Sequence, residues 1–444
     1  MTRWACLVLV LLGVSASPLA AQGLRGQIEQ LFIFGEGDSP LFLSGSADPD
    51  NPAGVQAHGE HFIPAAQASN ATVIDFLTSA IGTNITNIPI SATSSGLTFR
   101  FEGGVPMQTS TSPGPIFAER GQTLGRGRVL VSASVNVFNF KSLRGVDLDQ
   151  VSLNFTHENS DFPNCDVIFA GDCGIYGLPD FENDVIRLDL QMDLDVIATM
   201  FLLTYGLHDR IDIGVALPLI STDLRGRSIA EVIPFGPSVN HFFSGTQASP
   251  GLTAERTVEG SATGLGDIAT RIKIAVGESE NARFSILGDA RWPTGDEEDL
   301  LGSGELSVRG LGIVSAQFGA FSPHANVGYL YRRGALQNDA VLATVGFDHL
   351  LAPWAALAVD VVSELQVGST ELRVPEDVTL EAPFQRTIRL TNIPNARDDI
   401  VNGSIGFKFV TPSGLILVAN TIWPLNDGGL RTHVSWTAGL EYNF

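Results

Sequence analysis

The feature of this chain that most constrains its fold is a set of long segments in which apolar and polar residues alternate. In the clearest one, 186–195, every even-numbered residue is Ile, Leu or Met and every odd-numbered residue is Arg, Asp or Gln. Successive side chains of a strand point to opposite faces, so a period of two places all the apolar groups on one face. The pattern recurs, for example in 268–276, 284–292 and 357–365, and it predicts an all-β protein.

Segment length separates a membrane barrel from a globular sandwich. The alternating segments run to roughly 10–14 residues, whereas strands of globular proteins centre near 5 or 6. About 9–11 tilted residues cross a bilayer, so these lengths suit a membrane. Residues 124–444 therefore predict an antiparallel transmembrane β-barrel of outer-membrane type with about twelve strands. The predicted strands are 124–141, 184–206, 210–221, 264–276, 282–293, 304–320, 323–333, 338–350, 354–367, 399–410, 413–423 and 431–444.

The connections between these strands alternate in length. Every second connection is a tight turn, whereas 142–183, 222–263 and 368–398 are long loops. Short periplasmic turns on one rim and long extracellular loops on the other are typical of outer-membrane barrels, and an even strand count places both barrel ends on the periplasmic side. Additional strands at 97–101 and 151–157 would raise the count to fourteen.

The part of the chain before residue 124 divides in two. Residues 1–21 combine Arg3, a short apolar run and small residues up to Ala21, as a removable secretory signal does. No later segment has the run of about 18 apolar residues that a transmembrane helix needs. Residues 22–123 lack sustained alternation and are too long for a plain linker. We expect them to form a plug in the lumen, with a periplasmic extension or partial disorder as the alternatives.

Charge and cysteine content limit the partners. The chain carries 26 basic and 48 acidic residues, a formal net charge of −22. Nucleic acids and anionic lipid head groups both need clustered Lys and Arg, so neither is expected as a partner, while the lipid of the outer membrane surrounds the barrel. Cys165 and Cys173 are close enough in sequence to form a disulfide in an oxidising compartment. Two thiolates without a nearby His make only half of a zinc site.

Charged residues within the strands lie on the face opposite the aliphatic one. On the lipid face an Arg or Lys at the bilayer midplane would cost about 2–4 kcal/mol, so these side chains are expected to face the lumen. They either form ion-pair ladders in a wet lumen, or a subset such as Arg271, Lys273 and Arg291 lines a solute route or holds the plug. The predicted lumen residues are Arg187, Asp189, Asp193, Asp195, Asp212, Asp267, Arg271, Lys273, Asp289, Arg291, Asp360, Glu364, Lys408 and Glu441.

No local motif predicts catalysis. His58 and His61 lack the helical spacing of a zincin, and the acidic residues in 295–299 lack the regular ligand spacing of a calcium loop. A metal or another cofactor is therefore not expected. A Ser–His–acid site, which is assembled in space rather than in sequence, has no local support here. We do not expect an enzyme.

The last predicted strand ends on an aromatic residue, Phe444. Tyr442 and Phe444 are expected in the periplasmic aromatic girdle. The strand resembles the carboxy-terminal signature by which outer-membrane proteins are recognised for assembly, which would make the assembly machinery a partner. The face expected to contact lipid consists of Val434, Trp436, Ala438, Leu440, Tyr442 and Phe444.

Four stretches carry a resemblance to a known family. They are GPIFAERGQTLGRG at 114–127, YGLHDRIDIG at 205–214, GLGDIATRIK at 264–273 and WPTGD at 292–296. Their order and spacing resemble the outer-membrane transporter family named for the meta-pathway of phenol degradation, which is akin to FadL-type channels for hydrophobic compounds. The resemblance implies passive uptake of small hydrophobic or aromatic molecules and transfers no site residue. The alternative is a structural or adhesive barrel whose long loops bind a surface partner.

Overall fold

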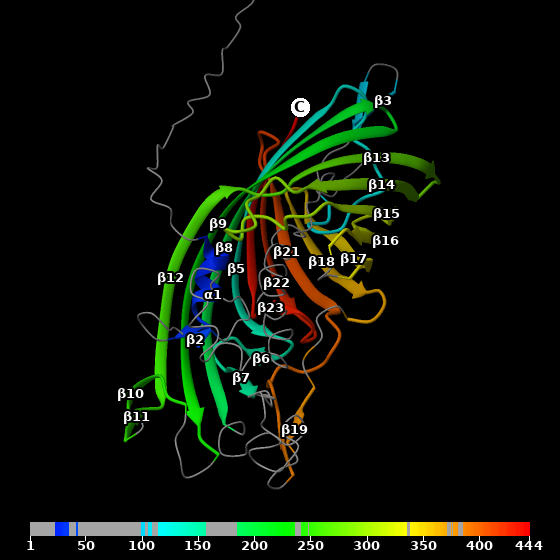
Figure 1. Cartoon of the computed structure of the whole chain (residues 1–444). Coiled ribbons are helices and arrows are strands. Elements are labelled where there is room, and N and C mark those ends of the chain that lie inside the picture. Colours follow the sequence, from blue (N-terminus) through cyan, green and yellow to red (C-terminus); the bar gives the residue numbers. More distant parts are fainter. Residues whose placement is uncertain are drawn as a thin grey trace, which may run out of the picture.

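Twelve antiparallel strands close into a barrel in the computed structural model, each of them hydrogen-bonded to two neighbours (Figure 1). The structure describes residues 23–34, 41–42, 99–102, 105–108, 114–156, 184–235, 241–246, 248–334, 338–370, 374, 376–380 and 385–444. In order around the ring the strands are β9 (Ile211–Ile233), β13 (Ile268–Glu278), β14 (Ala282–Trp292), β15 (Ser307–Ala316), β16 (Phe321–Arg332), β17 (Ala340–Ala352), β18 (Ala355–Gln366), β21 (Ile400–Val410), β22 (Ile416–Pro424), β24 (Ser435–Asn443), β5 (Val129–Leu143) and β8 (Val185–His208).

The remaining described elements lie outside the ring. Four strands pair with members of the ring without joining it: β6 (Val146–Asp147), β7 (Val151–Thr156), β12 (Thr253–Leu265) and β23 (Leu430–Thr432). Four separate hairpins are β1 (Ile33–Phe34) with β2 (Leu41–Phe42), β3 (Phe99–Glu102) with β4 (Val105–Gln108), β10 (Ser244–Thr246) with β11 (Ser249–Gly251), and β19 (Val378–Leu380) with β20 (Arg386–Ile388). The helix is α1 (Leu24–Gln30). Within the described residues no helix is long and apolar enough to cross a membrane.

Each ring strand corresponds to one predicted strand, so the predicted all-β barrel and its count of twelve are confirmed. The alternative of fourteen strands is wrong for the ring. Of the two additional segments, β7 pairs with β8 alone, and β3 pairs only with β4 in a sheet of its own. Neither has the second ring neighbour that membership of a closed barrel requires.

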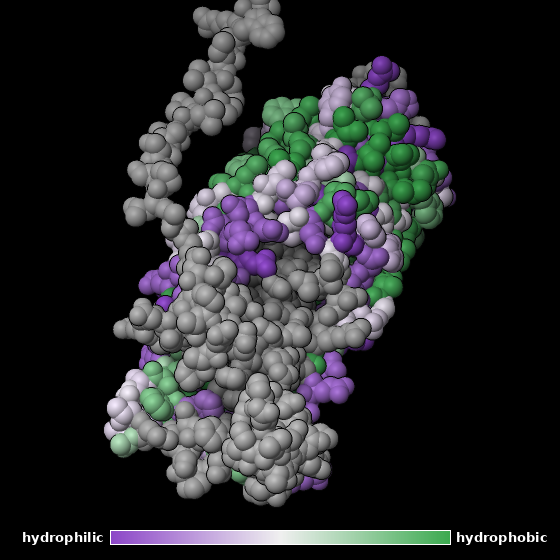
Figure 2. Space-filling model, viewed as in Figure 1, coloured by the Kyte–Doolittle hydropathy of each residue, from purple (hydrophilic) through white to green (hydrophobic). Residues whose placement is uncertain are grey.

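The outer face of the barrel is apolar. Along β8, Ile197, Phe201 and Leu203 are 45%, 48% and 47% exposed, and they alternate with buried residues. Ile286 and Val361 on other strands are exposed in the same way. Figure 2 shows hydrophobic residues gathered over the upper part of the wall, around β13 and β14. A closed barrel with such an outer band is built for lipid, so the protein is an outer-membrane β-barrel.

The ring closes where β24 pairs with β5. Trp436 is opposite Val137 in this pair, and the backbones of Phe444 and Val129 exchange hydrogen bonds of 2.8 and 3.4 Å. Trp436 and Phe444 are 62% and 71% exposed on the outer face. The ring of Tyr442 meets that of Phe444 edge-on at a centroid distance of 4.7 Å. The last strand thus presents aromatic groups to lipid.

One side of the wall continues beyond the apolar band, away from the rim that holds residue 444 (Figure 1). We call residues 185–195 of β8, 221–233 of β9 and 253–263 of β12 the extension. Within it, outward positions on β8 and β9 become charged. At about 3.3 Å per residue, the β8 part alone rises roughly 33 Å. The prediction of a loop at 222–263 is therefore wrong, because this stretch contains the end of β9 and the whole of β12.

The extension reverses the predicted orientation of four charged residues. Arg187, Asp189, Asp193 and Asp195 were predicted to face the lumen, but they are exposed on the outer face, in the same row as Ile197. The physical reason is that this row leaves the lipid between residues 197 and 195. Beyond that point the outside is water, so charges point outward at little cost.

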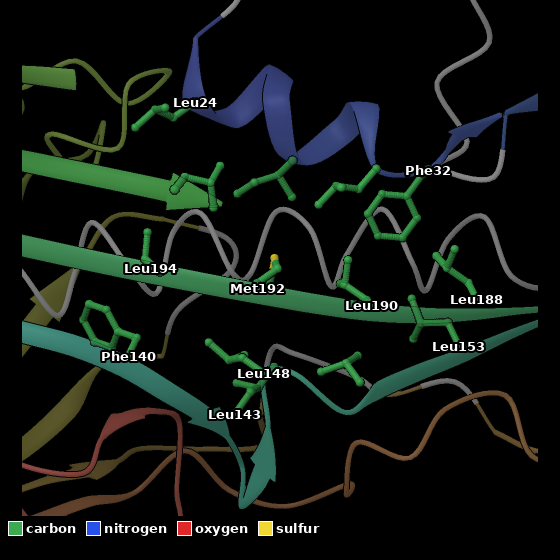
Figure 3. Packing of buried hydrophobic residues seen from close by; sticks show 14 of the residues in the cluster. Leu24, Phe32, Phe140, Leu143, Leu148, Leu153, Leu188, Leu190, Met192 and Leu194 are labelled. Carbon is green, nitrogen blue, oxygen red and sulfur yellow. The ribbon is translucent and has the colours of Figure 1, made fainter. Parts of the chain in front are cut away.

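The inner face of the extension is a hydrophobic core. Leu188, Leu190 and Leu194 of β8 are at most 3% exposed and pack in one cluster with Leu24 and Phe32 of the amino-terminal segment (Figure 3). One glycine on each of β9 and β12, Gly226 and Gly260, makes room for the segment formed by α1 and Leu31. A Cβ added at Gly260, for example, would come within 2.8 Å of Leu24 Cδ2. The aliphatic face of 186–194 therefore contacts protein, whereas the sequence interpretation had placed it against lipid.

Candidate functional site

Residues 114–124 cross the interior of the barrel, and we call them the strap. Residues 114–121 are all buried. At one end Ile116 and Phe117 pack against Val418 of β22. At the other end the Leu124 N–H donates to both carboxylate oxygens of Asp212 on β9, at 3.1 and 3.0 Å. Three ring strands separate β22 from β9 on one side and seven on the other, so the strap spans the lumen.

Glu119 of the strap is bound by two cations of β13. Its Oε1 accepts a hydrogen bond of 2.6 Å from Arg271 Nη2, and its Oε2 lies 3.5 Å from Lys273 Nζ. All three side chains are 3–4% exposed. Arg271 and Lys273 are two positions apart on one strand, so alternation directs both to the inside. Removing one member of such a buried group typically costs about 3–5 kcal/mol, because the remaining charge is left unpaired.

The next strap residue, Arg120, is bound by a different part of the wall. Its Nη2 donates to Asp348 Oδ2 on β17 at 2.9 Å, and Asp348 is fully buried. Beside this pair, His324 of β16 lies with its Nε2 2.6 Å from Asp360 Oδ1 on β18. Glu119 thus binds β13, and the next residue, Arg120, binds β17, which lies four strands farther round the ring. This arrangement fixes both the position and the rotation of the strap.

The backbone of the strap is also tied to the wall, at Gly121. The Gly121 carbonyl accepts a hydrogen bond of 2.5 Å from Ser285 Oγ, and its N–H donates to Ser315 Oγ at 3.0 Å. A Cβ at this position would come within 2.4 Å of the Arg283 carbonyl oxygen. Glycine is required here because the strap touches the backbone of the wall directly.

A second polar group lies on the inner side of β14 and β15. Asp289 is shared by two guanidinium groups: Arg291 Nε is 3.5 Å from its Oδ1, and Arg309 Nη2 is 3.2 Å from its Oδ2. Farther round the ring, Lys408 Nζ lies 3.1 Å from Glu441 Oε1. These contacts form part of a wall in which buried charges are paired with one another.

Two predicted residues lie at the boundary between the barrel and its loops. Asp267 holds the loop that follows β14: its Oδ1 accepts from the Gly295 N–H at 3.0 Å, and its Oδ2 accepts from Ser303 at 2.8 Å (N–H) and 2.6 Å (Oγ). The Glu364 carboxylate accepts a hydrogen bond from Arg332. The predicted residues that are buried on the inner side are Asp212, Asp267, Arg271, Lys273, Asp289, Arg291, Asp360, Lys408 and Glu441.

Another part of the lumen wall, along β8, is apolar. Every inward position from Ile186 to Leu202 carries Ile, Leu, Met, Val or Ala, and each of these side chains is at most 7% exposed. The track begins in the extension and continues into the part of β8 whose outward residues, from Ile197 on, face lipid. In a water-filled channel these inward positions are polar. The barrel thus combines a charged inner wall with an apolar one.

Sequence reasoning missed four buried residues that bind or surround the strap: Glu119, Arg120, His324 and Asp348. The strap lies outside the alternating segments, so no alternation indicated which way the side chains of Glu119 and Arg120 point. The signal that was present is an adjacent acid–base pair within an otherwise uncharged run, 114–125. Buried charges in such a run need partners from elsewhere in the fold.

Some predicted features fall outside the described residues. Residues 1–21, the proposed disulfide between Cys165 and Cys173, and the pair His58 and His61 belong to this group. Among the residues that the structure describes, no group of three or more His, Cys, Asp or Glu side chains is arranged to hold a metal ion.

Comparison with known proteins gives distant structural neighbours. No protein-family model matches the sequence, and no curated protein matches it. An outer-membrane channel from Pseudomonas putida F1 is 12% identical, with 73% of this chain and 97% of that chain covered and a TM-score of 0.40. A FadL homologue from Pseudomonas aeruginosa is 8% identical over 71% and 89%, with a TM-score of 0.31. The toluene transporter TodX of P. putida is 8% identical over 71% and 89%, with a TM-score of 0.33. Values this low do not place the chain in a family.

Proposed function

We propose that the protein is an outer-membrane channel through which small hydrophobic molecules cross passively, with the strap as its closing element. The observation that carries this proposal is the apolar track on the inner face of β8. An apolar solute that leaves water loses unfavourable hydration when it contacts such a surface. The track starts in the extension and runs into the lipid-spanning part of the wall, and the segment that covers it, which includes α1, has to move aside before a solute can reach it.

The strap gives the channel a closed state. Glu119 binds it to β13 and Arg120 binds it to β17, through contacts of 2.6 and 2.9 Å. We assign the plug role expected for residues 22–123 to two described parts of that range, the strap and α1. Residues 1–21 stay a predicted export signal.

The solute class and the remaining partners are part of the proposal. The four motifs that resemble the phenol meta-pathway transporters point to aromatic compounds as the transported class. The outer row of β24, with Trp436 and Phe444, suits recognition by the outer-membrane assembly machinery. No catalytic step is proposed.

Uptake of a radiolabelled aromatic hydrocarbon by cells that carry the protein in their outer membrane tests the track. In the double variant Val196→Thr/Met200→Gln the inner face of β8 becomes polar with little change of volume, and we expect initial uptake to fall several-fold. The matched control is Thr199→Val, which changes an outward side chain of the same strand. Equal uptake by the double variant and the wild type would contradict the proposal.

The strap has a separate test in planar bilayers. Glu119→Gln leaves Arg271 and Lys273 without their carboxylate, so we expect the strap to loosen and ion conductance to rise. Glu231→Gln, which changes a carboxylate on the outer face of the extension, is the control and should conduct like the wild type. An unchanged conductance in Glu119→Gln would show that the strap does not close the lumen.

A further inference from the structure

β12 has one paired edge and one open edge. All of its 13 residues pair with β9, from Thr253 opposite Glu231 to Leu265 opposite Leu219, without a register shift. It is the terminal strand of the sheet path, so no described strand lies on its other side (Figure 1). The strand belongs to the extension, so its open edge lies outside the membrane.

The backbone register shows which groups point to the open edge. The Val232 N–H donates to the Leu252 carbonyl and the Gly266 N–H to the Pro218 carbonyl, which fixes the even-numbered positions of β12 as those that bond to β9. The odd-numbered residues therefore direct their N–H and C=O groups away from β9. No backbone hydrogen bond within the described chain reaches these groups. The residues concerned are Thr253, Glu255, Thr257, Glu259, Ser261 and Thr263, all of them exposed.

Edge strands in soluble regions are usually protected. Protection comes from short length, proline, charged side chains (lysine above all) or a bulge, since a long unpaired row of N–H and C=O groups is a template for another strand. β12 is 13 residues long, contains neither Pro nor Lys, and pairs without a shift. Its charged residues are already bonded within the chain, Glu255 and Glu259 to arginines of β9 and Arg256 to Gln30. An open edge of this kind is the surface used in β-strand addition.

A second copy of the chain fits this edge poorly. Two copies in one membrane point the same way, so an edge-to-edge contact between their β12 strands is parallel and two-fold symmetric. In that contact the odd-numbered residues of both copies would point their N–H and C=O groups at the shared edge. A parallel ladder places each such residue opposite one whose groups point away, so two copies at equal height in the membrane cannot form the ladder.

The outer row of charges indicates a different partner. On β9, Arg225 lies 3.3 Å from Glu259, and Arg227 lies 2.7 Å from Glu255. Glu255 and Glu259 thus each have an arginine on the β9 side, while no described strand lies on their other side. A strand that brings Lys or Arg to that position completes a cation–anion–cation row across three strands.

We propose that the open edge of β12 binds an extended, basic segment of another polypeptide at the cell surface by β-strand addition. Backbone hydrogen bonds to the odd-numbered residues supply the affinity, and Glu255 and Glu259 select a segment in which Lys or Arg alternates with small residues. This interaction is independent of the transport proposal, because neither the strap nor the inner face of β8 takes part in it.

A synthetic ten-residue peptide of alternating Lys and Thr is the probe, with purified full-length protein in detergent and fluorescence anisotropy as the measurement. The wild type should bind it, and should bind an alternating Glu–Thr peptide at least about tenfold more weakly. Thr257→Pro/Ser261→Pro removes two edge N–H groups without touching the β9 ladder, and should weaken binding about tenfold or more. The matched control, Thr257→Val/Ser261→Ala, keeps both N–H groups and should bind like the wild type.

A second variant keeps the test independent of any effect of proline on folding. Glu255→Gln/Glu259→Gln should remove the preference for the Lys–Thr peptide over the Glu–Thr peptide. Absence of binding to the wild type, or unchanged binding by the double-proline variant, overturns the proposal. Equal binding of the two peptides by the wild type overturns the basic partner. All three protein variants should take up the aromatic hydrocarbon at the wild-type rate, which separates this result from the transport test.

Discussion

In both the lipid-spanning wall from β13 to β17 and the extension, apolar and polar residues alternate along each strand. The apolar residues point outward in the wall and inward in the extension. In the wall, Ile272 and Ile286 point outward, while Arg271, Lys273 and Asp289 are buried on the inside. In the extension, charged residues such as Arg187 point outward, and the aliphatic side chains form the inner core. A period of two shows that the faces of a strand differ, but the medium on each side decides which face turns out.

β8 passes from the extension into the lipid-spanning wall as one uninterrupted strand. Its inner row stays apolar from Ile186 to Leu202, while its outer row changes from Asp195 to Ile197 in a single step of the alternation. Only the outer row of β8 therefore changes residue type where lipid ends and water begins. The following predictions test this contrast in order of decreasing effect.

The largest effect is expected from the inner face of the extension. Leu190→Ala removes a side chain that is 1% exposed in the core beside α1, and should cost about 2–5 kcal/mol. Gln191→Ala, its exposed neighbour, should change stability by less than about 0.5 kcal/mol. Urea unfolding in lipid vesicles gives both values. Similar losses for the two variants would mean that the inner face of β8 is not a packed core.

The next effect compares the outer row on either side of the lipid boundary. Leu203→Arg places a charge in the apolar band and should cost about 2–4 kcal/mol near the midplane. Gln191→Arg makes the same change on the same row of β8 beyond the band, where water solvates the charge, and should be close to neutral. The same unfolding experiment measures both. If the two costs are equal, the extension does not leave the membrane.

The smallest effect concerns pH and the charged surface of the extension. The hydrogen bond from Arg227 lowers the pKa of the Glu255 carboxyl below its usual range. A carboxyl whose pKa is lower in the folded state stabilises the fold above its unfolded pKa and loses that contribution as the pH falls through the lowered value. Hydrogen exchange of the even-numbered β12 amides, which bond to β9, should therefore stay protected at neutral pH and become faster in acid, after correction for intrinsic rates. Glu255→Gln should show a smaller change.

The barrel fold could be predicted from the sequence because apolar and polar residues alternate along each ring strand, over a length that suits a bilayer. The inward charges of β13 and β14 followed from the same reasoning, and the structure buries Arg271, Lys273, Asp289 and Arg291 on the inner side. For Arg187 and its neighbours the reasoning was wrong because it assumed lipid along the whole strand. Nothing in residues 185–195 themselves distinguishes an outer row in water from an inner row in a wet lumen.

The position of the strap could not be predicted from the sequence, for a different reason. Its position depends on contacts between residues far apart in the chain, such as Arg120 with Asp348. Each partner taken alone is an ordinary charged residue. Only the closed ring brings β13 and β17 to opposite sides of the same short segment.

The uninterrupted course of β9 has a mechanical consequence. From Ile211 to Ile233 it is paired with β8 on one edge, and with β13 and then β12 on the other. Sliding this strand along its axis by one step would turn every side chain to the wrong face and break both ladders together. The wall therefore behaves as a stiff frame. The strap belongs to no ladder, and a few ion pairs and hydrogen bonds hold it, so it is the element that the proposed opening would move while the frame keeps its shape.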